Sequence, residues 1–404
     1  MARFYAALRR WFPFRTLLRV GAARLGGSLA MLRPVQNRIY IAAPHDRALR
    51  GSLRLIHDEL ARATPVPVLL VECRSAIQAL DHFALARSIS GLFLTLRGAY
   101  RVASSRVVLV DDYYFPIYPI ARRPGTTIVQ VWHASGAFKR FGRATLEKGW
   151  GADTDFVRYV AIHSNYDLAL VSSESVAPAY AEAFGTPIST FTARYGMPNT
   201  DPLVDPVRSA PARERTRSRL GIGSNEIAVL WAPTFRGTNI LEATAPSNLD
   251  LELLMSRLSP RHRLILRMHP FVQQSLKIPT ALRDRVVDAS IEEDINDVLL
   301  AGDILVSDYS SLIYEFSLLG RPIALFAPDL DRYEQERGFF FDYRTGVPGP
   351  VFAETSELAT WISAASFDLE RVRAFATRSF DRADGHATER LVEQVILPAY
   401  AERG

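Results

Sequence analysis

The chain has 404 residues, 48% of them hydrophobic and 23% charged, and a formal net charge of +5. This composition excludes a disordered chain and a multi-span membrane protein, and the length is typical of two domains because single cores seldom exceed about 250 to 300 residues. The single cysteine, Cys73, excludes an internal disulfide, and the basic excess favours an anionic partner such as nucleic acid, a phosphate-bearing metabolite or an acidic membrane.

Positive charge is concentrated at the start of the chain, in residues 1–36. Eight arginines precede the first acidic residue, Asp46, and large apolar residues lie between them. The pattern indicates a basic amphipathic segment that lies on an anionic membrane surface. No run approaches the roughly 20 apolar residues that span a bilayer, so the segment is not expected to cross the membrane. A basic helix docked on the protein and an organellar presequence are the alternatives.

Short apolar runs alternate with helix-like stretches along the rest of the chain, which is typical of βαβ units and parallel sheets. The runs fall into two sets, separated by a proline-rich linker near 199–212. A polar helix near 212–222 is expected to be exposed. We therefore expect an α/β protein with a Rossmann-like domain over 37–205 and a second over 206–404. The predicted strands are residues 39–43, 66–71, 106–110, 127–132, 168–171, 227–232, 263–268, 303–307 and 323–327.

Unusual polar residues stand at the end of four predicted strands. Ligands of open parallel sheets bind beyond the carboxyl ends of the strands, so these residues are the candidate site. They are His133, Arg236, Arg267 with His269, and Asp308 with Ser310 and Ser311.

The stretch VSDYSSLIYEF (306–316) marks the junction between a buried strand and a helix. Apolar residues recur at helical spacing from Leu312, so Asp308, Ser310 and Ser311 precede or begin the helix. The free N–H groups and dipole of a helix start bind phosphate, and serine hydroxyls add donors. The alternative is that Asp308 or Ser310 only caps the helix.

His133 and His269 each follow a predicted strand, one in each domain. The ordinary histidine pKa near 6.5 lets such a side chain accept a proton from an attacking hydroxyl or give one to a leaving phosphate. Hydrogen-bonded structural histidines are the alternative for both.

Several cations lie near these loops, namely Lys139, Arg140, Arg236 and Arg267. Arg236 and Arg267 lie closest to strand ends and are preferred as ligands of a diphosphate. The acid pair in VDDYY (110–114) is not assigned a metal, because no further carboxylate ligands can be located. The motifs of P-loop kinases, dinucleotide dehydrogenases, zinc hydrolases and α/β-hydrolases are absent from the sequence.

An ordered set of motifs resembles the CDP-glycerol glycerophosphotransferase family of teichoic acid and related phosphopolymer synthesis. The motifs are VWHASGAFKRFG, YGMPNTD, LWAPTFRG, RMHP and SDYSSLIYEFSLLGRPIALFAPDLDRYEQERGFFFDY, and they run from about residue 127 to residue 343. The resemblance implies a GT-B fold, with two Rossmann-like domains facing an interdomain cleft and a last helix, near 387–402, that crosses back to the first domain.

The same resemblance implies a reaction and assigns roles. A polyol phosphate, with glycerol phosphate preferred over ribitol phosphate, would pass from a CDP-activated donor to a hydroxyl of a lipid-linked saccharide acceptor, with release of CMP. The protein would act at the cytoplasmic face of the membrane, without nucleic acid and without an assigned cofactor or metal. His133 would activate the acceptor hydroxyl and His269 would stabilise or protonate the leaving phosphate. Arg236, Arg267, Ser310 and Ser311 would hold the diphosphate, Asp308 would orient the loop, and Gly196 and Pro198 would shape the turn that faces the nucleotide.

Two motifs depart from the family pattern. His133 is followed by Ala134-Ser135-Gly136 where many members have GTP, which is similar to the short priming enzymes, and the GxPRxD turn lacks its arginine at Asn199. The length favours a primase over a polymerase. A GT-B glycosyltransferase that uses a nucleotide sugar and a non-enzymatic, membrane-associated nucleotide-binding protein are the rival interpretations.

Overall fold

A computed structural model describes residues 2–44, 46–73, 84–148, 157, 159–237, 243–246, 249–272, 276–291 and 294–401. The chain divides into two compact units, and each is described by itself. Unit 1 comprises residues 1–133, 142–199 and 386–404, and unit 2 comprises residues 134–141 and 200–385. Each unit has one six-stranded sheet, and all the strand pairs are parallel.

The sheet of unit 1 has the strand order β2-β1-β3-β4-β5-β6. Its central strands are buried on both faces, as continuous apolar runs require. Apolar residues of β1, β3 and β4 pack with helix α2 and with the C-terminal helical segment. The strands are β1 (Gln36–Ala43), β2 (Leu69–Cys73), β3 (Ser105–Val110), β4 (Thr127–Gln130), β5 (Leu168–Leu170) and β6 (Phe191–Thr192).

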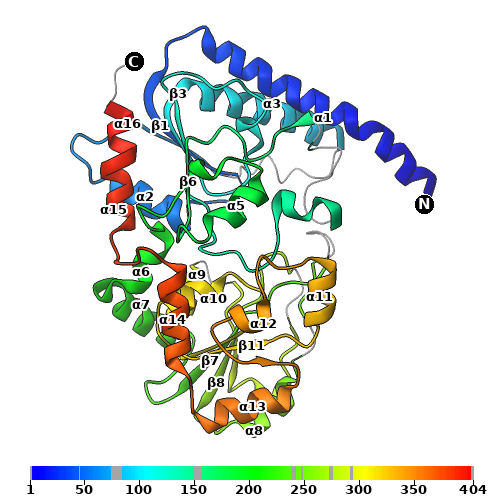
Figure 1. Cartoon of the computed structure of the whole chain (residues 1–404), viewed down its shortest axis with the longest axis vertical. Coiled ribbons are helices and arrows are strands. Elements are labelled where there is room, and N and C mark those ends of the chain that lie inside the picture. Colours follow the sequence, from blue (N-terminus) through cyan, green and yellow to red (C-terminus); the bar gives the residue numbers. More distant parts are fainter. Residues whose placement is uncertain are drawn as a thin grey trace. The chain divides into compact units, whose positions relative to one another are not determined.

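Helices cover this sheet. The longest, α1, lies along α3 (Figure 1). Helix α2 buries Leu53, Ile56 and Leu60 at helical spacing. The helices of unit 1 are α1 (Ala2–Met31), α2 (Gly51–Leu60), α3 (Ala84–Ser104), α5 (Ala177–Phe184), α15 (Ala387–Leu391) and α16 (Leu397–Ala401), the last two joined by a π-helical stretch, Val392–Ile396.

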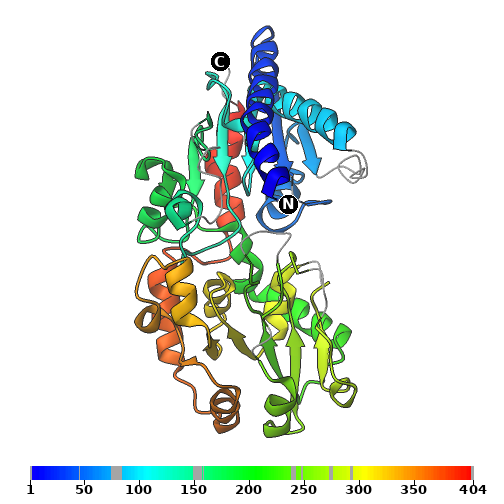
Figure 2. The same ribbon diagram turned by 90° about the vertical axis from the view of Figure 1, so that its right-hand side faces the viewer.

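The sheet of unit 2 has the strand order β12-β11-β10-β7-β8-β9. Figure 2 shows strands of this sheet side by side, in green to olive. The order reverses at β7 and β10, and adjacent carboxyl ends at such a reversal are the usual ligand-binding edge of a doubly wound sheet. The strands are β7 (Ile227–Trp231), β8 (His262–Leu266), β9 (Val286–Asp288), β10 (Ile304–Ser307), β11 (Ile323–Phe326) and β12 (Val351–Phe352).

Helix starts in unit 2 are capped by aspartates. The Asp250, Asp294 and Asp368 side chains accept N–H bonds of the first turns of α8, α9 and α14. The helices are α6 (Asp201–Val204), α7 (Pro206–Arg219), α8 (Leu251–Arg257), α9 (Ile295–Ala301), α10 (Leu312–Ser317), α11 (Leu330–Glu336), α12 (Tyr343–Gly346), α13 (Thr355–Ala364) and α14 (Leu369–Ser379).

Residues 134–141 pack within unit 2, although the residues on either side of them belong to unit 1. Phe138 is buried in the core of unit 2, with its ring centroid 4.4 Å from that of Tyr314. Lys139 forms an antiparallel bridge with Phe339. The segment is thus packed and bridged to unit 2 directly after His133.

The nine predicted strands are all present, and their two sets form the two sheets. Strand β2 begins at Leu69, later than the predicted residue 66, because Pro65 and Pro67 have no N–H to donate to a neighbouring strand. The polar helix α7 is exposed over most of its length, as expected, but its Arg217 is buried and bonds to Asp303 at 2.9 Å.

Candidate functional site

His133 stands just beyond the carboxyl end of β4 in unit 1. The strand is held to its neighbour up to Val131, whose N–H donates to the Val110 carbonyl at 2.8 Å. Trp132 then takes a positive φ of 49°, which non-glycine residues seldom adopt. Trp132 is only 8% exposed, and its packing fixes the turn that projects His133 outward. Strain of this kind is typical of residues next to functional side chains.

The ring of His133 is oriented by one hydrogen bond and one stacking contact. Its Nδ1 lies 3.0 Å from the backbone oxygen of Asp111, and its ring lies 4.6 Å from that of Trp132 with an interplanar angle of 28°. A carbonyl oxygen can only accept, so Nδ1 of the imidazole carries the hydrogen. The neutral ring therefore has its lone pair on Nε2, as a general base requires.

Two titratable side chains surround this histidine. Burial raises the pKa of Asp111 to about 7, although its interaction with the His133 ring opposes the increase. Burial lowers the pKa of His163 to about 4, and its ring stacks on Phe184 at 3.9 Å. His163 is therefore neutral at pH 7 and has a structural role, whereas Asp111 places a partly ionised carboxyl next to the exposed His133.

Gly196 and Pro198 form the turn after β6. Gly196 has a φ of 78°, so a side chain would strain the backbone there. Its N–H donates to the Ala193 carbonyl at 3.0 Å, and Pro198 starts a short 3₁₀ turn, Pro198–Thr200. The turn is thus fixed in shape, and Asn199 lies within it.

In unit 2, Arg236 lies between two aspartates. Its guanidinium is 2.9 Å from the Asp308 carboxylate and 2.7 Å from that of Asp329. Burial lowers the pKa of Arg236, and the two carboxylates more than reverse this, so its net pKa shift is upward. The Arg236 charge is thus already compensated, and the cluster keeps the residues after β7, β10 and β11 together.

The Asp308 side chain, only 1% exposed, also organises the backbone. Its Oδ1 accepts the N–H groups of Thr234 at 2.7 Å and Tyr309 at 2.6 Å. Ser310 Oγ accepts the Leu312 N–H at 3.3 Å, and Ser311 is the N-cap residue of α10 without a side-chain cap bond. Asp308 fixes the loop, and both half-buried serines stand at the start of α10.

Arg267 occupies a different kind of place from Arg236. It is 8% exposed, and its guanidinium donates to the backbone oxygens of Ala289, at 3.0 Å, and Ser290. The residue therefore holds the chain after β9 against the end of β8, directly below His269.

His269 lies beyond β8, and its ring packs in a cluster with two aromatic side chains that also contact each other. The ring centroids are 4.8 Å from Phe235 and 4.6 Å from Phe271. Its Nδ1 accepts the backbone N–H of Phe271 at 3.2 Å. The neutral ring must then carry its hydrogen on Nε2, which makes Nε2 a donor. The two predicted histidines thus have opposite tautomers, one suited to accept a proton and the other to donate.

Two acidic side chains at this edge of unit 2 were missed in the sequence. Asp329 holds Arg236, and Glu315, 3% exposed, accepts the Ser135 N–H at 3.1 Å through Oε1. The signals were present: Asp329 follows the predicted strand 323–327, and Glu315 lies one helical turn after Ser311.

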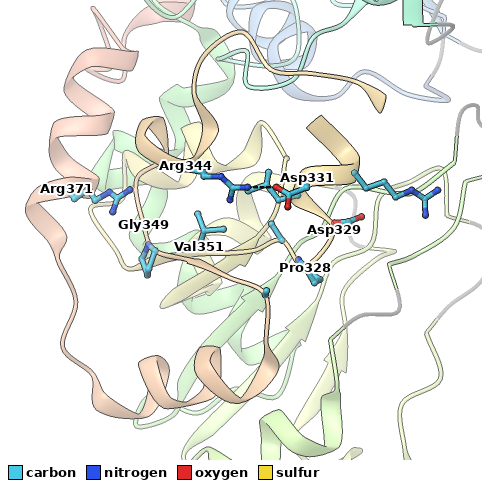
Figure 3. A pocket seen from close by; sticks show the side chains of 12 residues that line it. Pro328, Asp329, Asp331, Arg344, Gly349, Val351 and Arg371 are labelled. Atoms are coloured by element: carbon cyan, nitrogen blue, oxygen red, sulfur yellow. Dashed lines mark hydrogen bonds and ion pairs between the residues drawn. The ribbon is translucent and has the colours of Figure 1, made fainter. Parts of the chain in front are cut away.

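A pocket of about 540 Å³ opens beside Asp329 (Figure 3). Charged residues of α11, α12 and α14 line it, among them Asp331, Arg344 and Arg371. Arg344 and Asp331 form an ion pair there. Among the described residues, no group of three His, Cys, Asp or Glu side chains is placed to hold a metal ion.

Known proteins match the chain over almost its whole length. A family model described as CDP-glycerol:poly(glycerophosphate) glycerophosphotransferase matches residues 28–397. The chain belongs to this family. All the candidate residues of both units lie within the match, and the histidine loop and the β10–α10 corner are therefore parts of a glycerophosphotransferase fold.

Two curated relatives come from Bacillus spizizenii. The chain is 32% identical to a teichoic acid ribitol-phosphate primase over 370 residues, which are 90% of this chain and 92% of the primase. It is also 32% identical to a teichoic acid poly(ribitol-phosphate) polymerase over 373 residues, 92% of this chain. Those residues are 58% of the polymerase, so the chain spans less than two thirds of that protein.

Among solved structures, the wall teichoic acid polymerase TagF has a similar fold. A variant of TagF soaked with CDPG gives a TM-score of 0.73 at 18% identity, with 98% of each chain covered. Together with the two parallel sheets, this similarity establishes a GT-B-like α/β fold.

Proposed function

We propose that the chain transfers a polyol phosphate from a CDP-activated donor to a hydroxyl of a lipid-linked acceptor and releases CMP. The acceptor oxygen attacks the phosphorus that carries the polyol, and the bond from that phosphorus to the oxygen of CMP breaks. His133 Nε2 takes the hydroxyl proton, and the Nε2–H of His269 bonds to the departing phosphate. The family match supplies the reaction class.

The observation that carries this proposal is the opposite tautomers of the two histidines. His133 donates through Nδ1 to Asp111, and His269 accepts through Nδ1 from Phe271. A phosphotransfer to an alcohol needs one base for the nucleophile and one donor for the leaving group. The proposal requires both rings to reach one donor molecule.

The proposal also covers whether the chain primes or polymerises, and which polyol phosphate it transfers. A primase-like activity is proposed over polymerisation, because Ala134-Ser135-Gly136 after His133 is similar to the short priming enzymes. Glycerol phosphate is the first candidate because CDP-glycerol names the family, and ribitol phosphate is the second because both relatives above are named for it.

The test is CMP release by the purified protein from CDP-glycerol and from CDP-ribitol, with and without a lipid-linked saccharide primer. Primer-dependent CMP from either donor supports the proposal, and the number of units on each primer separates priming from polymerisation. No CMP from either donor contradicts the proposal and directs attention to nucleotide sugars.

We propose further that α1 holds the protein against an anionic membrane. Its buried face consists of small residues: Thr16, Val20, Ala23, Gly26, Gly27 and Ala30. From residue 14 on, its large apolar side chains point the other way. Phe14, Leu17, Leu18, Leu25, Leu29 and Met31 are 41% to 54% exposed, and Leu32, directly after the helix, is 80% exposed.

A helix that docks on a protein core usually buries its large apolar side chains, whereas α1 buries small residues and exposes the large ones. At about 100° per residue, the exposed apolar residues form one stripe, with Arg15 and Arg33 at its edge. An apolar stripe bordered by arginines matches the interface of an anionic bilayer. None of the helices in the described ranges is long and apolar enough to span a membrane.

Replacement of Leu18, Leu25 and Leu29 by serine is expected to weaken binding to phosphatidylglycerol vesicles at least tenfold, because three inserted side chains are lost. Sedimentation with vesicles measures it. Ile188→Ser is the matched control, since Ile188 is 55% exposed in unit 1 but lies outside α1. Equal binding by the triple variant and the wild type would remove α1 from the membrane contact.

A further inference from the structure

Lys139 has an unusual environment for a lysine. The residue is half-buried, and within the described ranges its ammonium makes no hydrogen bond or ion pair. The charged groups that face it are the guanidinium groups of Arg337 and Arg236 and the carboxylate of Asp308. Burial, followed by repulsion from Arg337, lowers the pKa of Lys139 to about 7, and Asp308 only partly opposes this.

The fold holds these two cations near each other. The bridge between Lys139 and Phe339 fixes the lysine backbone. Arg337 Nε donates to the Arg140 carbonyl at 3.1 Å, and its Nη1 lies 3.3 Å from the Tyr333 hydroxyl. Arg337 is therefore held in place by bonds of its own, and the repulsion between the two side chains is built into the structure.

The neighbouring cluster does not supply positive charge. Arg236 lies between the carboxylates of Asp308 and Asp329, so one cation is shared by two anions. A diphosphate that approached this cluster alone would meet net negative charge. Another cation must offset that charge, and Lys139, which has no carboxylate partner among the described residues, is one that faces the cluster.

The lysine lies at the edge where the proposed donor site stands. Its own segment packs on the start of α10, where a Cβ on Gly136 would lie 2.2 Å from ring carbons of Tyr314. The Tyr343 hydroxyl donates to the Asp308 carbonyl, and the Tyr343 ring centroid lies 6.0 Å from that of Phe138. Residues 136 and 138 thus pack against α10, the helix that begins after Ser311.

We propose that Lys139 binds a phosphate group of the CDP-activated donor and takes up a proton when that group arrives. The inference rests on the proposed function and adds a residue to it. An amine that is desolvated and lies beside guanidinium groups has a low affinity for its proton. A phosphate anion that binds next to it stabilises the charged ammonium and so raises that affinity. The lipid-linked acceptor also carries phosphate, so the experiment must separate the two sources.

Lys139→Met separates a ligand-binding role from a structural one. If Lys139 binds phosphate, the methionine keeps the apolar stem, removes a costly buried charge and leaves the melting temperature unchanged or raised. If the ammonium stabilised the fold, the melting temperature would fall. Lys139→Arg keeps a charge that does not titrate below pH 9. Arg140→Gln is the matched control, because it removes a neighbouring positive charge that lies over the Phe340 ring at 5.1 Å.

The experiment is isothermal titration of the full chain with CDP-glycerol and CDP-ribitol at pH 7.0 and 8.5, in two buffers of different ionisation enthalpy. The wild type should take up a fraction of a proton at pH 7.0 and bind more weakly at pH 8.5. Lys139→Met should bind at least tenfold more weakly at pH 7.0 without proton uptake. Lys139→Arg should bind without the pH dependence, and Arg140→Gln should match the wild type.

The outcomes are distinct. Wild-type affinity and proton uptake in Lys139→Met overturn the assignment of Lys139 alone. If Lys139→Met has unchanged affinity for the donor but a raised KM for the lipid-linked acceptor, the donor assignment is overturned. Lys139 then binds the phosphate of the acceptor. A wild-type protein that binds neither CDP-polyol overturns both the inference and the proposed function.

Discussion

His163 is enclosed by aromatic rings and has lost most of its tendency to bind a proton. It is 6% exposed, its ring is 3.9 Å from that of Phe184, and its Nδ1 is 3.2 Å from the Tyr166 hydroxyl. His133 has the opposite situation, exposed and next to the half-buried Asp111. Burial is therefore the main cause that keeps His163 neutral at pH 7.

The buried His163 predicts an acid-labile component of stability. Its pKa in the folded protein is about 4, below the ordinary value of 6.5, so the unfolded chain binds the proton first. The contribution of neutral His163 to the free energy of unfolding is complete above pH 6.5. This contribution is lost as the pH falls towards 4, by up to about 3 kcal/mol. Urea unfolding at pH 7.5 and 4.5 measures the difference.

His163→Asn should reduce that pH dependence, since asparagine tolerates the positive φ of 60° and does not titrate. His386→Asn, at an exposed position near the C-terminus, is the control and should leave the dependence intact. An identical pH profile for His163→Asn and the wild type would show that His163 is not the titrating group.

At the residue scale, the sequence predicted which residues lie at strand ends, but not their bonds. Strand periodicity places His133, His269, Arg236 and Asp308 correctly, because alternation and length determine where a strand ends. That Arg236 is shared by Asp308 and Asp329 depends on residues far apart in the chain. Pattern alone contains no information on such a contact.

At the element scale, long apolar strands were predictable and short edge strands were not. Strands β6, β9 and β12 have two or three residues each, too few for a periodic signal. The burial of Arg217 in α7 was also not predictable, because its bond to Asp303 depends on a residue far away in the chain. In the sequence alone, such an arginine is expected to be a surface charge.

The docking of residues 134–141 on unit 2 depends on the absence of a side chain at Gly136. A Cβ there would lie 2.2 Å from Tyr314 ring carbons, which real contacts do not allow. Gly136→Ala is therefore expected to destabilise the protein by about 1 to 3 kcal/mol through overpacking. Chemical denaturation measures the change in unfolding free energy.

Gly91→Ala is the matched control for that prediction. Gly91 lies within α3 and has no neighbour within 4 Å of an added Cβ, so alanine should be neutral or stabilising by up to about 1 kcal/mol. Equal stability of Gly136→Ala and the wild type would mean that the segment is not held tightly against α10.

At the scale of the whole molecule, the two sets of strands predicted two α/β domains, and the two sheets confirm them. The assignment of residues 134–141 to unit 2 could not be predicted, because this loop directly follows a strand of unit 1. It gives the chain a direct covalent link between His133 and the segment that carries Lys139.

The measurement that tests the central claim most directly is single-turnover CMP formation by glutamine and alanine variants of the two histidines. A base at His133 cannot be replaced by an amide, so His133→Gln and His133→Ala should both lose about 10² to 10⁴ in rate. A donor at His269 can be partly replaced, because the glutamine amide offers N–H near the Nε2 position, so His269→Gln should exceed His269→Ala by at least tenfold. His133→Gln within tenfold of the wild type, or equal rates for the two His269 variants, would contradict the proposed roles of the two histidines.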